Sequence, residues 1–384
     1  MKLTVNTREL RDAIDLAIAA HPRDEEIVLQ WVQESAAKLT LVTEGQLLTV
    51  TSIGIDGDSD GELYGTALYK LEQLLDPFDS EKVTITASKS YMLLQANKLR
   101  GQIALSDVHL DSGRFPSDIS FNQEGPFAIV SYDQFRKAVA DMTAVASRMV
   151  LGDRRVGHIE IVSIDKQLHM MATDSYKFGF REIENHAIIN SEVVVQAAML
   201  ERVVRKLASP IDMIFLGMRG NRLVIGTPDW FVAIPTVGFK VTDLSQINKL
   251  VLTDHHKPMG FNRRELISAV KAAASVTKGL HIIEIDFSKY GTTVSTCIHP
   301  GNHPGEQMTG DQIIKEVSCE PDTDDWPDEI IQMHFNANYL LDLLEAMEGN
   351  DCTVFVGRYS DALTIMGDDK DIAGFLALSP IMQR

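Results

Sequence analysis

Two short sequence phrases each occur three times along this chain of 384 residues. The first phrase is Leu-Arg-Asp-Ala-Ile or a close variant, and it occupies residues 10–14, 135–139 and 266–270. The second is a Leu-rich phrase at residues 71–75, 200–204 and 340–344. Copies of the first phrase are 125 and 131 residues apart, and copies of the second are 129 and 140 residues apart. A repeat of about 128 residues indicates three similar structural units in series.

Each repeat shows the same order of local patterns. Amphipathic spacing predicts a first helix at residues 7–20, 132–148 and 262–278, and a second helix at residues 66–77, 197–208 and 336–348. Alternating apolar residues predict strands between the helices, and Val83–Ala87 with Tyr91–Gln95 is typical of an antiparallel hairpin. Helices set among antiparallel strands indicate an α+β fold rather than βαβ winding. The predicted domains span residues 1–123, 124–250 and 251–384.

The composition is that of a globular protein, with 45% hydrophobic and 23% charged residues. No basic and apolar leader follows Met1, and no stretch approaches the ~18 apolar residues of a membrane span. Three cysteines, Cys297, Cys319 and Cys352, lack the spacing of a metal site and indicate reduced thiols. We therefore expect a cytoplasmic protein.

Charge is distributed unevenly along the chain. The formal net charge is −18, which by itself argues against binding to nucleic acid. Residues 133–155, 199–206 and 263–278 nevertheless hold 12 Lys or Arg and 5 Asp or Glu, a local balance of +7. Because these segments are the repeated helices and an adjoining loop, we expect one surface that tolerates DNA. The alternative is that these cations only solubilise exposed helix faces.

Motifs that would indicate catalysis or metal binding are weak. Asp56–Gly61 resembles the start of a calcium loop, but Ala67 stands where the bidentate Glu belongs, so an acidic turn is the better interpretation. Cys297, His299 and His303 match no zinc pattern. Phosphate-loop, nucleophile-elbow and dinucleotide motifs are absent. We predict no enzyme activity, cofactor or metal; the rival is a metal-dependent nuclease that uses the loop at 297–303.

Two segments favour binding of a short peptide. Ala172–Phe178 is too polar and aromatic for an ordinary turn after a strand. Phe375–Arg384 is an apolar strand that reaches a proline and leaves Ile381 and Met382 beyond it. Met, Ile and Phe beside Pro can form an adaptable apolar groove. The alternative is a terminal strand whose last side chains pack into the core.

At these residues the chain resembles the bacterial sliding clamp family, the β subunit of DNA polymerase III, over its whole length. Met1–Val5 and the following helix are similar to the family's start, and Gly113–Ser117 resembles the Phe-Pro element that ends its first domain. Ala172–Phe178 is similar to the family's Ala-Thr-Asp-Gly-His-Arg-Leu segment. Phe335–Met347 resembles the helix of the third domain, and the C-terminal strand ending in proline also matches.

The resemblance implies three tandem DNA-clamp domains, each with two helices and antiparallel sheets, in a head-to-tail homodimer. Two chains would close a ring around double-stranded DNA, with the helices lining the hole. Weak, sequence-independent phosphate contacts would leave the ring free to slide. By position, the DNA-facing candidates are Arg23, Arg136, Lys137, Arg148, Arg154, Arg155, Arg202, Arg205, Lys206 and Lys271. Arg154 and Arg155 fall where the family carries DNA-contacting tyrosines.

The resemblance also implies a pocket that docks short motifs from a replicative polymerase, a clamp loader and repair proteins. Carried over by position, the pocket comprises Val156, Thr173, Ser175, Tyr176, Lys177, Phe178, Thr242, Gln246, Ile247, Ala377, Ser379, Pro380, Ile381 and Met382. The chain departs from the family at Ser175–Lys177, where the family has Gly-His-Arg, and at its C-terminal residues. We therefore expect a changed motif preference.

A processivity clamp without catalysis is thus the leading prediction, acting in the cytoplasm and on the nucleoid during replication. The family's dimer contacts would fall on Ser275 and Val276, which are less apolar than the usual pair. A second rival is a clamp-like module that binds partners without encircling DNA.

Overall fold

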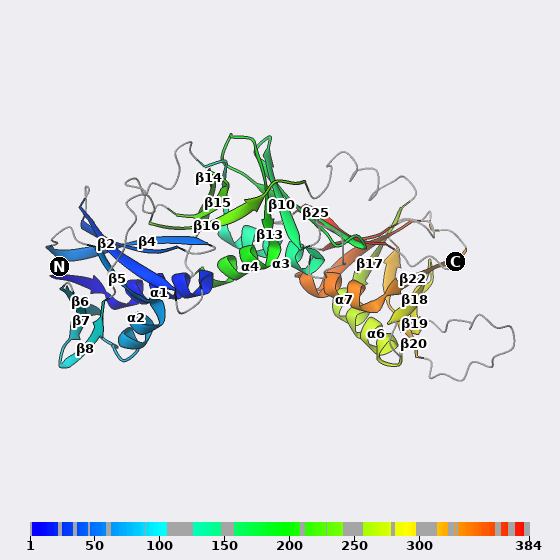
Figure 1. Ribbon diagram of the computed structural model, residues 1–384. Coiled ribbons are helices and arrows are strands. Elements are labelled where there is room, and N and C mark those ends of the chain that lie inside the picture. The colour runs from blue at the N-terminus through cyan, green and yellow to red at the C-terminus, as the bar shows by residue number, and fades with distance from the viewer. Residues whose placement is uncertain are drawn as a thin grey trace. The chain divides into compact units, whose positions relative to one another are not determined.

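The computed structural model describes most of the chain (Figure 1). The described residues are 2–21, 25–33, 37–44, 47–58, 63–88, 90–105, 126–146, 157–207, 212–227, 229–240, 256–277, 281–296, 313–321, 326, 329–357, 362–367 and 373–379. Both predicted domain boundaries lie outside these residues.

The helices agree with the sequence prediction to within a few residues. In the described part of the chain they are α1 (Thr7–Ala20), α2 (Leu68–Leu75), α3 (Tyr132–Ala146), α4 (Ala197–Lys206), α6 (Arg263–Ser275) and α7 (Ala337–Ala346). Three of them start at an asparagine whose side chain accepts backbone N–H groups of the first turn: Asn6, Asn262 and Asn336. These caps satisfy donors that have no partner inside a helix, and so fix where each helix begins.

The first repeated phrase marks the helix face that packs into the core. Its apolar end positions are Leu10 and Ile14 in α1, which are at most 2% exposed. The corresponding residues of α3 and α6 are equally well buried and are Phe135, Val139, Leu266 and Val270. Residues four apart lie on one face of a helix. The phrase therefore recurs because the first helix of each repeat buries the same apolar stripe.

Contacts group the chain into two compact units. Unit 1 comprises residues 1–136, 163–166 and 184–237, and unit 2 comprises residues 137–162, 167–183 and 238–384. Each unit therefore combines one end of the chain with part of its middle. The cut falls within α3, between Arg136 and Lys137.

Unit 1 is built on two sets of antiparallel strands. Its strands are β1 (Lys2–Asn6), β2 (Glu26–Gln33), β3 (Ala37–Glu44), β4 (Leu48–Asp58), β5 (Leu63–Ala67), β6 (Lys82–Ala87), β7 (Tyr91–Ala96), β8 (Leu99–Ala104), β9 (Ala128–Ser131), β13 (Ser191–Gln196), β14 (Met213–Arg219), β15 (Arg222–Gly226) and β16 (Trp230–Val237). The long strand β4 connects the two sets: it pairs with β3 and β16 along its first part and with β1 along its last four residues.

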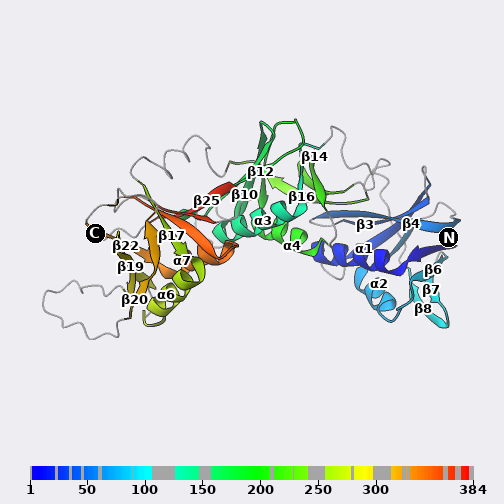
Figure 2. The ribbon, with the colours of Figure 1, turned by 180° about the vertical axis from the view of Figure 1, so that it is seen from behind.

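The β4–β16 pair joins the first and middle thirds of the sequence inside unit 1. Trp230 lies opposite Thr51 and Ala233 lies opposite Leu48. A small apolar cluster at this junction includes Val50, Val224 and Phe231. Helices α1 and α4 lie on the same side of strands β4 and β16 in both ribbon views (Figures 1 and 2).

Unit 2 repeats this arrangement, and the last residues of two of its strands, β10 and β12, belong to unit 1. Its strands are β10 (His158–Ile164), β11 (Gln167–Thr173), β12 (Lys177–Glu184), β17 (Lys257–Asn262), β18 (Ile282–Ser288), β19 (Gly291–Thr296), β20 (Ile314–Val317), β21 (Cys319–Pro321), β22 (Ile331–Asn336), β23 (Asp351–Val356), β24 (Leu363–Gly367) and β25 (Ala373–Leu378). Here the last strand, β25, pairs antiparallel with β12 of the middle third. A separate four-stranded sheet has the order β20-β19-β18-β22.

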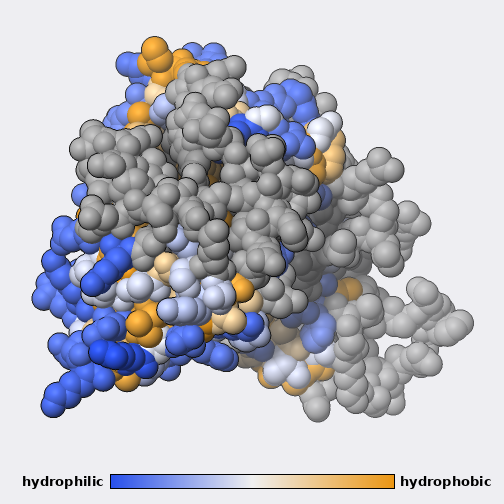
Figure 3. Space-filling view, turned by 60° about the vertical axis from the view of Figure 1, so that its left-hand side comes forward, coloured by the Kyte–Doolittle hydropathy of each residue, from blue (hydrophilic) through white to orange (hydrophobic). Residues whose placement is uncertain are grey.

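The α+β fold predicted from the repeats is confirmed, since helices lie among antiparallel pairs such as β6–β7, β14–β15 and β18–β19. The predicted hairpin at residues 83–95 is the β6–β7 pair. Among the described residues no helix is long and apolar enough to cross a membrane. Hydrophilic residues cover much of the described surface in Figure 3, with hydrophobic residues in smaller groups between them.

Candidate peptide and nucleic-acid interfaces

The β12–β25 junction brings together two segments that the sequence analysis assigned to one pocket. Lys177 lies opposite Leu378 and Phe178 lies opposite Ala377 in the antiparallel register. The backbone N–H of Ser379 donates to the carbonyl of Tyr176 over 2.8 Å and extends the pair by one bond. Residues about 200 positions apart thus form one continuous surface because a strand from each segment completes the same sheet.

A tight turn presents Tyr176 at the start of β12. The Asp174 carboxylate accepts the backbone N–H groups of Tyr176 and Lys177, at 3.1 and 2.7 Å. The Thr173 hydroxyl accepts the N–H of Ser175, whose φ of +74° is left-handed. Side chains that accept local N–H groups stabilise such turns. The turn leaves Tyr176 50% exposed, with its ring stacked on Tyr339 at 5.6 Å between centroids.

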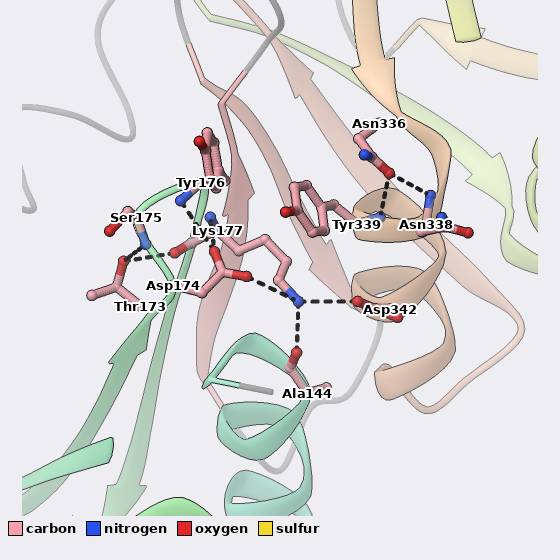
Figure 4. A network of polar contacts seen from close by, with 10 residues as sticks. All are labelled: Ala144, Thr173, Asp174, Ser175, Tyr176, Lys177, Asn336, Asn338, Tyr339 and Asp342. Carbon is pink, nitrogen blue, oxygen red and sulfur yellow. Dashed lines mark hydrogen bonds and ion pairs between the residues drawn. The ribbon is translucent and has the colours of Figure 1, made fainter. Parts of the chain in front are cut away.

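The Lys177 side chain points into the protein (Figure 4). Its ammonium donates to the Ala144 carbonyl at 2.8 Å and to Asp342 Oδ2 at 3.1 Å. Asp174 Oδ2 lies 3.5 Å away at ion-pair distance, and the Tyr339 ring centroid lies 5.4 Å from the ammonium. A buried ammonium is stable only when paired, so this network holds α3, α7 and the turn together.

This network changes how Lys177 can contribute to a pocket. Its residue exposure is 1%, so the ammonium supports the turn from beneath while Tyr176 and Ser175 face outward. The two partners on α7, Tyr339 and Asp342, were not among the site residues predicted from the sequence. Both lie within Phe335–Met347, the segment that resembles the family's third-domain helix.

Apolar side chains lie next to the turn along the same strand pair. Phe375 packs against Phe178 and Phe180, with ring centroids 6.0 and 5.7 Å apart, and these rings cover Met171. Ala377 is buried, whereas Thr173 and Phe178 are half-buried and Ser379 is exposed. The remaining predicted pocket residues lie outside the described residues: Val156, Thr242, Gln246, Ile247, Pro380, Ile381 and Met382.

The predicted DNA-facing cations that the structure describes lie on helices. In unit 1, Arg136, Arg202, Arg205 and Lys206 are exposed. In unit 2, Lys271 is exposed and Lys137 is half-buried. Arg23, Arg148, Arg154 and Arg155 lie outside the described residues.

Several of these cations already contact carboxylates. Arg136 pairs with Asp133 at 3.0 Å and Arg205 with Glu201 at 2.7 Å, each within one helix. Lys137 of α3 pairs at 3.2 Å with Glu348, which follows the end of α7, and Lys271 of α6 pairs with Glu345 of α7 at 2.7 Å. The pairs of Arg136, Arg205 and Lys271 are exposed and contribute little to stability, so these cations can exchange a carboxylate for a phosphate.

The predicted dimer contacts lie at the C-terminal end of α6, next to the start of β20. Ser275 is exposed and Val276 half-buried. The Thr296 hydroxyl connects the two elements, because it donates to the Ala273 carbonyl at 3.1 Å and accepts the N–H of Ile313 at 3.2 Å. The next residue, Ile314, is 60% exposed on β20, the edge strand of its sheet. Ile314 was not among the residues singled out from the sequence.

The weak metal motifs gain no support from the described residues. Asp56 lies in β4, where its carboxylate pairs with Lys82 at 3.4 Å and both side chains are exposed. No group of three His, Cys, Asp or Glu side chains placed to hold a metal occurs in the described part of the chain. Cys297, His299 and His303 lie outside it. Cys352 is a buried free thiol, and burial raises its pKa to about 12.

The described elements define an α+β fold in which the last strand of one repeat completes a sheet of the preceding repeat, once in each unit. This is the fold of the DNA polymerase sliding clamps, as comparison with solved structures shows. No protein-family model matches the sequence, and no curated protein matches it.

The solved structures match over the full length of both chains despite low sequence identity. The β subunit from the DNA polymerase of Streptococcus pyogenes has a TM-score of 0.81 at 13% identity, with 100% of each chain covered. The DNA polymerase sliding clamp from Pseudomonas aeruginosa has a TM-score of 0.77 at 14% identity, also with 100% of each chain covered. The DNA polymerase III β subunit from Thermotoga maritima gives the same three values.

Proposed function

We propose that this protein is a DNA sliding clamp that tethers a replicative polymerase and other motif-bearing proteins to duplex DNA, without catalysis of its own. The observation that carries the proposal is the full-length match to clamp structures, at a TM-score of 0.81 with 100% coverage. The threefold repeat supports it independently, because it arises from the sequence alone. In this role the protein acts in the cytoplasm on nucleoid DNA.

The proposal includes three domains, at residues 1–123, 124–250 and 251–384. The two contact units do not follow this division because strand pairing crosses the proposed boundaries: β16 completes the sheet that contains β4, and β25 completes the sheet that contains β12. A third pairing of the same kind would join β8, the last described strand of the first proposed domain, to β20, the corresponding strand of the third. We assign this pairing to strands of two different copies.

A head-to-tail dimer follows from this third pairing. β8 ends the path β1-β6-β7-β8 in unit 1, and β20 ends the four-stranded sheet in unit 2. Open edges offer unpaired N–H and C=O groups to another strand. Because β8 of one copy would meet β20 of the other, the contact is heterologous, and two such contacts close a ring. Ile314, Ser275 and Val276 would lie in it.

DNA would be held by the exposed cations on the helices, through phosphate contacts without base readout. Few contacts suffice when the ring holds DNA topologically, which reconciles the role with a net charge of −18. Reversing Arg154 and Arg155 to Glu should impair loading or sliding and leave folding intact. Wild-type retention on DNA in that double variant would count against their assignment.

Partner motifs would dock at the β12–β25 junction, against Tyr176, Phe178 and the residues that follow Ser379. Deleting residues 381–384 should abolish binding of a clamp-binding peptide, measured by fluorescence anisotropy, because it removes the apolar Ile381 and Met382. Unaltered affinity would remove the pocket from the proposal.

The state of association tests the proposal as a whole. Sedimentation and small-angle X-ray scattering at micromolar protein should show a two-chain particle with the distance distribution of a hollow ring. A monomer under these conditions, or a compact dimer without a central opening, would contradict it.

A further inference from the structure

Two arginines face each other at the tip of the hairpin formed by β14 and β15. Arg219 and Arg222 are directly opposite in the antiparallel register, so their side chains lie on one face of the sheet, with Cβ atoms about 5 Å apart. Both residues belong to unit 1, and the two strands are labelled in Figure 1. Like charges at this separation destabilise a strand pair unless a counter-charge lies between them.

The turn between the strands fixes the two arginines relative to each other. It consists of Gly220 and Asn221, and Gly220 has a φ of +57°, which is typical of the first position of a type II′ hairpin turn. The Asn221 carbonyl accepts both the backbone N–H and the hydroxyl of Thr236, at 2.9 and 2.8 Å. The tip is therefore tied to β16, so the backbones of both arginines are in place before a ligand arrives.

Neither guanidinium has a counter-ion. Within the described part of the chain, Arg219 and Arg222 form no ion pair and no side-chain hydrogen bond, although the sequence contains 54 Asp and Glu. Burial lowers the pKa of His21, and the charge of Arg222 adds to this shift, so Arg222 lies near the His21–Glu25 pair. The Glu25 carboxylate, however, is bonded to His21 at 2.5 Å.

One part of each guanidinium is packed into the protein and the other part is open. Both residues are half-buried, and Nη1 of each is closed to solvent without a hydrogen-bond partner. Nε and Nη2 also lack partners among the described residues, but they are not closed to solvent, so a ligand can reach them. The Nε–Nη2 edge is a fork of two donors that matches two oxygens of an oxyanion.

Two such forks side by side favour a ligand with more than two oxygens. A carboxylate has two oxygens and fills one fork, whereas a phosphate group with three or four free oxygens can accept from both. A phosphomonoester carries about −1.5 to −2 charges at pH 7, which balances two guanidinium groups. A phosphodiester has two free oxygens and a single charge, so it matches the pair less well.

The arginine pair lies outside the surfaces assigned above. Arg222 alternates with Val224 along β15, so both side chains lie on the sheet face that carries the cluster of Val50, Val224 and Phe231. The core that includes α1 uses the opposite face, for example through Ile53 of β4. The described DNA-facing candidates are on helices and the docking site is at β12–β25, so neither includes this pair.

We propose that Arg219 and Arg222 form a binding site for a dianionic phosphate group, either inorganic phosphate or a phosphomonoester. Each arginine donates from Nε and Nη2 to the group, one fork from each strand. The bound phosphate removes the repulsion between the two guanidinium groups. The site goes beyond the proposed clamp function and does not depend on it.

Phosphorus NMR of the ligands tests the proposal with the full-length protein at about pH 8 and constant ionic strength. Inorganic phosphate and methyl phosphate are the dianionic probes, and dimethyl phosphate is the monoanionic diester. The dianions should bind saturably and roughly tenfold or more tightly than the diester. Tighter binding of methyl phosphate would identify an esterified group as the ligand, and equal or tighter binding of inorganic phosphate would identify the free ion. No binding of either dianion, or equal affinity for the diester, would overturn the proposal.

Two double variants locate the binding. Arg219→Gln with Arg222→Gln should abolish it, because both forks are lost. Arg219→Lys with Arg222→Lys keeps the charges without the forks and should weaken binding roughly tenfold or more. The matched control is Arg8→Gln with Lys70→Gln, which removes two exposed cations of unit 1 and should bind normally. Unchanged binding in the glutamine variant would exclude this site, and unchanged binding in the lysine variant would overturn the assignment to guanidinium forks.

Urea unfolding gives an independent readout and shows that each variant folds. Phosphate should raise the unfolding midpoint of the wild type more than that of the glutamine variant, because only the native wild type binds it at this site. Equal shifts would show that phosphate acts only as a stabilising salt, and would overturn the proposal. All variants should remain on circular DNA, so a failure of phosphate binding leaves the clamp function standing.

Discussion

Individual residues decide where this protein is rigid. Lys177 is the clearest case, since its buried ammonium connects a turn, the end of α3 and α7. Its charge is useful only because three oxygen atoms surround it. The exposed Tyr176 depends on that support, because both residues belong to the same turn.

Lys177→Met should destabilise unit 2 by roughly 3 kcal/mol, because it leaves the Asp174 carboxylate buried and unpaired. Asp342→Asn should cost less, about 1 kcal/mol, because Asp342 is partly exposed and its amide replacement still offers an acceptor. Urea unfolding followed by circular dichroism measures both. Equal stability of Lys177→Met and the wild type would refute the structural role of this ammonium.

His21 makes the stability of unit 1 depend on pH. Burial lowers the pKa of His21 from 6.5, although its hydrogen bond to Glu25 opposes the shift. The unfolded chain then binds the proton more readily than the folded chain, so stability is complete above pH 6.5 and falls as the pH drops below it. One such group gives a slope of at most about 1.4 kcal/mol per pH unit.

His21→Gln should flatten this dependence between pH 5 and 7 in denaturant titrations. His186, which is exposed in the same unit, provides the control as His186→Gln. The same slope in His21→Gln as in the wild type would contradict the assignment.

At the scale of elements, the strand pairs that cross the repeats organise the molecule. Gly374 shows how closely β25 approaches β12: its φ is +138°, and a Cβ there would collide with the carbonyl oxygen of Phe180. Gly179 on β12 packs equally closely, since a Cβ would lie 2.6 Å from Met142 and 2.8 Å from Val145 of α3. Glycine at both positions allows sheet and helix to meet.

Gly374→Ala should therefore weaken the β12–β25 pair and destabilise unit 2 by about 2 kcal/mol or more. Gly238→Ala is the control, because nothing lies within 4 Å of its added Cβ and its φ is unstrained. Hydrogen exchange of the backbone amides of Phe180 and Leu376 measures how stable the β12–β25 strand pair is. Equal protection in both variants would show that the close approach has no energetic consequence.

The edge strand β20 is the element on which dimer formation should depend. Ile314→Lys should weaken the dimer roughly tenfold or more, because an ammonium at the pairing edge would be buried without a partner. The control is Ile330→Lys, at an equally exposed residue (64%) just before β22 on the opposite side of the same sheet. Sedimentation equilibrium measures both. An unchanged dimer in Ile314→Lys would place the interface elsewhere.

The sequence predicted the helices well and the site only in part, for physical reasons. Buried stripes are a local signal, to which α1 and α7 add an asparagine cap, so α1, α4 and α7 fall where periodicity placed them. The β12–β25 pair depends on residues about 200 positions apart, and only the resemblance to a family brought those segments together. The inward orientation of Lys177 could not be predicted, because its partners Ala144 and Asp342 come from two other helices.

For the whole molecule, we propose that two copies enclose DNA. This proposal is supported independently by the sliding-clamp fold, by two strand edges without a partner strand among the described residues, and by the exposed helix cations. Enclosure differs from ordinary binding in one respect: it depends on the topology of the DNA and only weakly on charge. Salt that abolishes phosphate contacts should leave an enclosed DNA bound.

The most direct measurement follows the protein on nicked circular duplex DNA after loading, by gel filtration in 0.5 M salt. We expect the protein to elute with the circle and to be released when a restriction enzyme linearises it. Ile314→Lys should fail to remain on the circle, and Ile330→Lys should remain. Loss from the intact circle at this salt concentration, or retention that survives linearisation, would contradict enclosure.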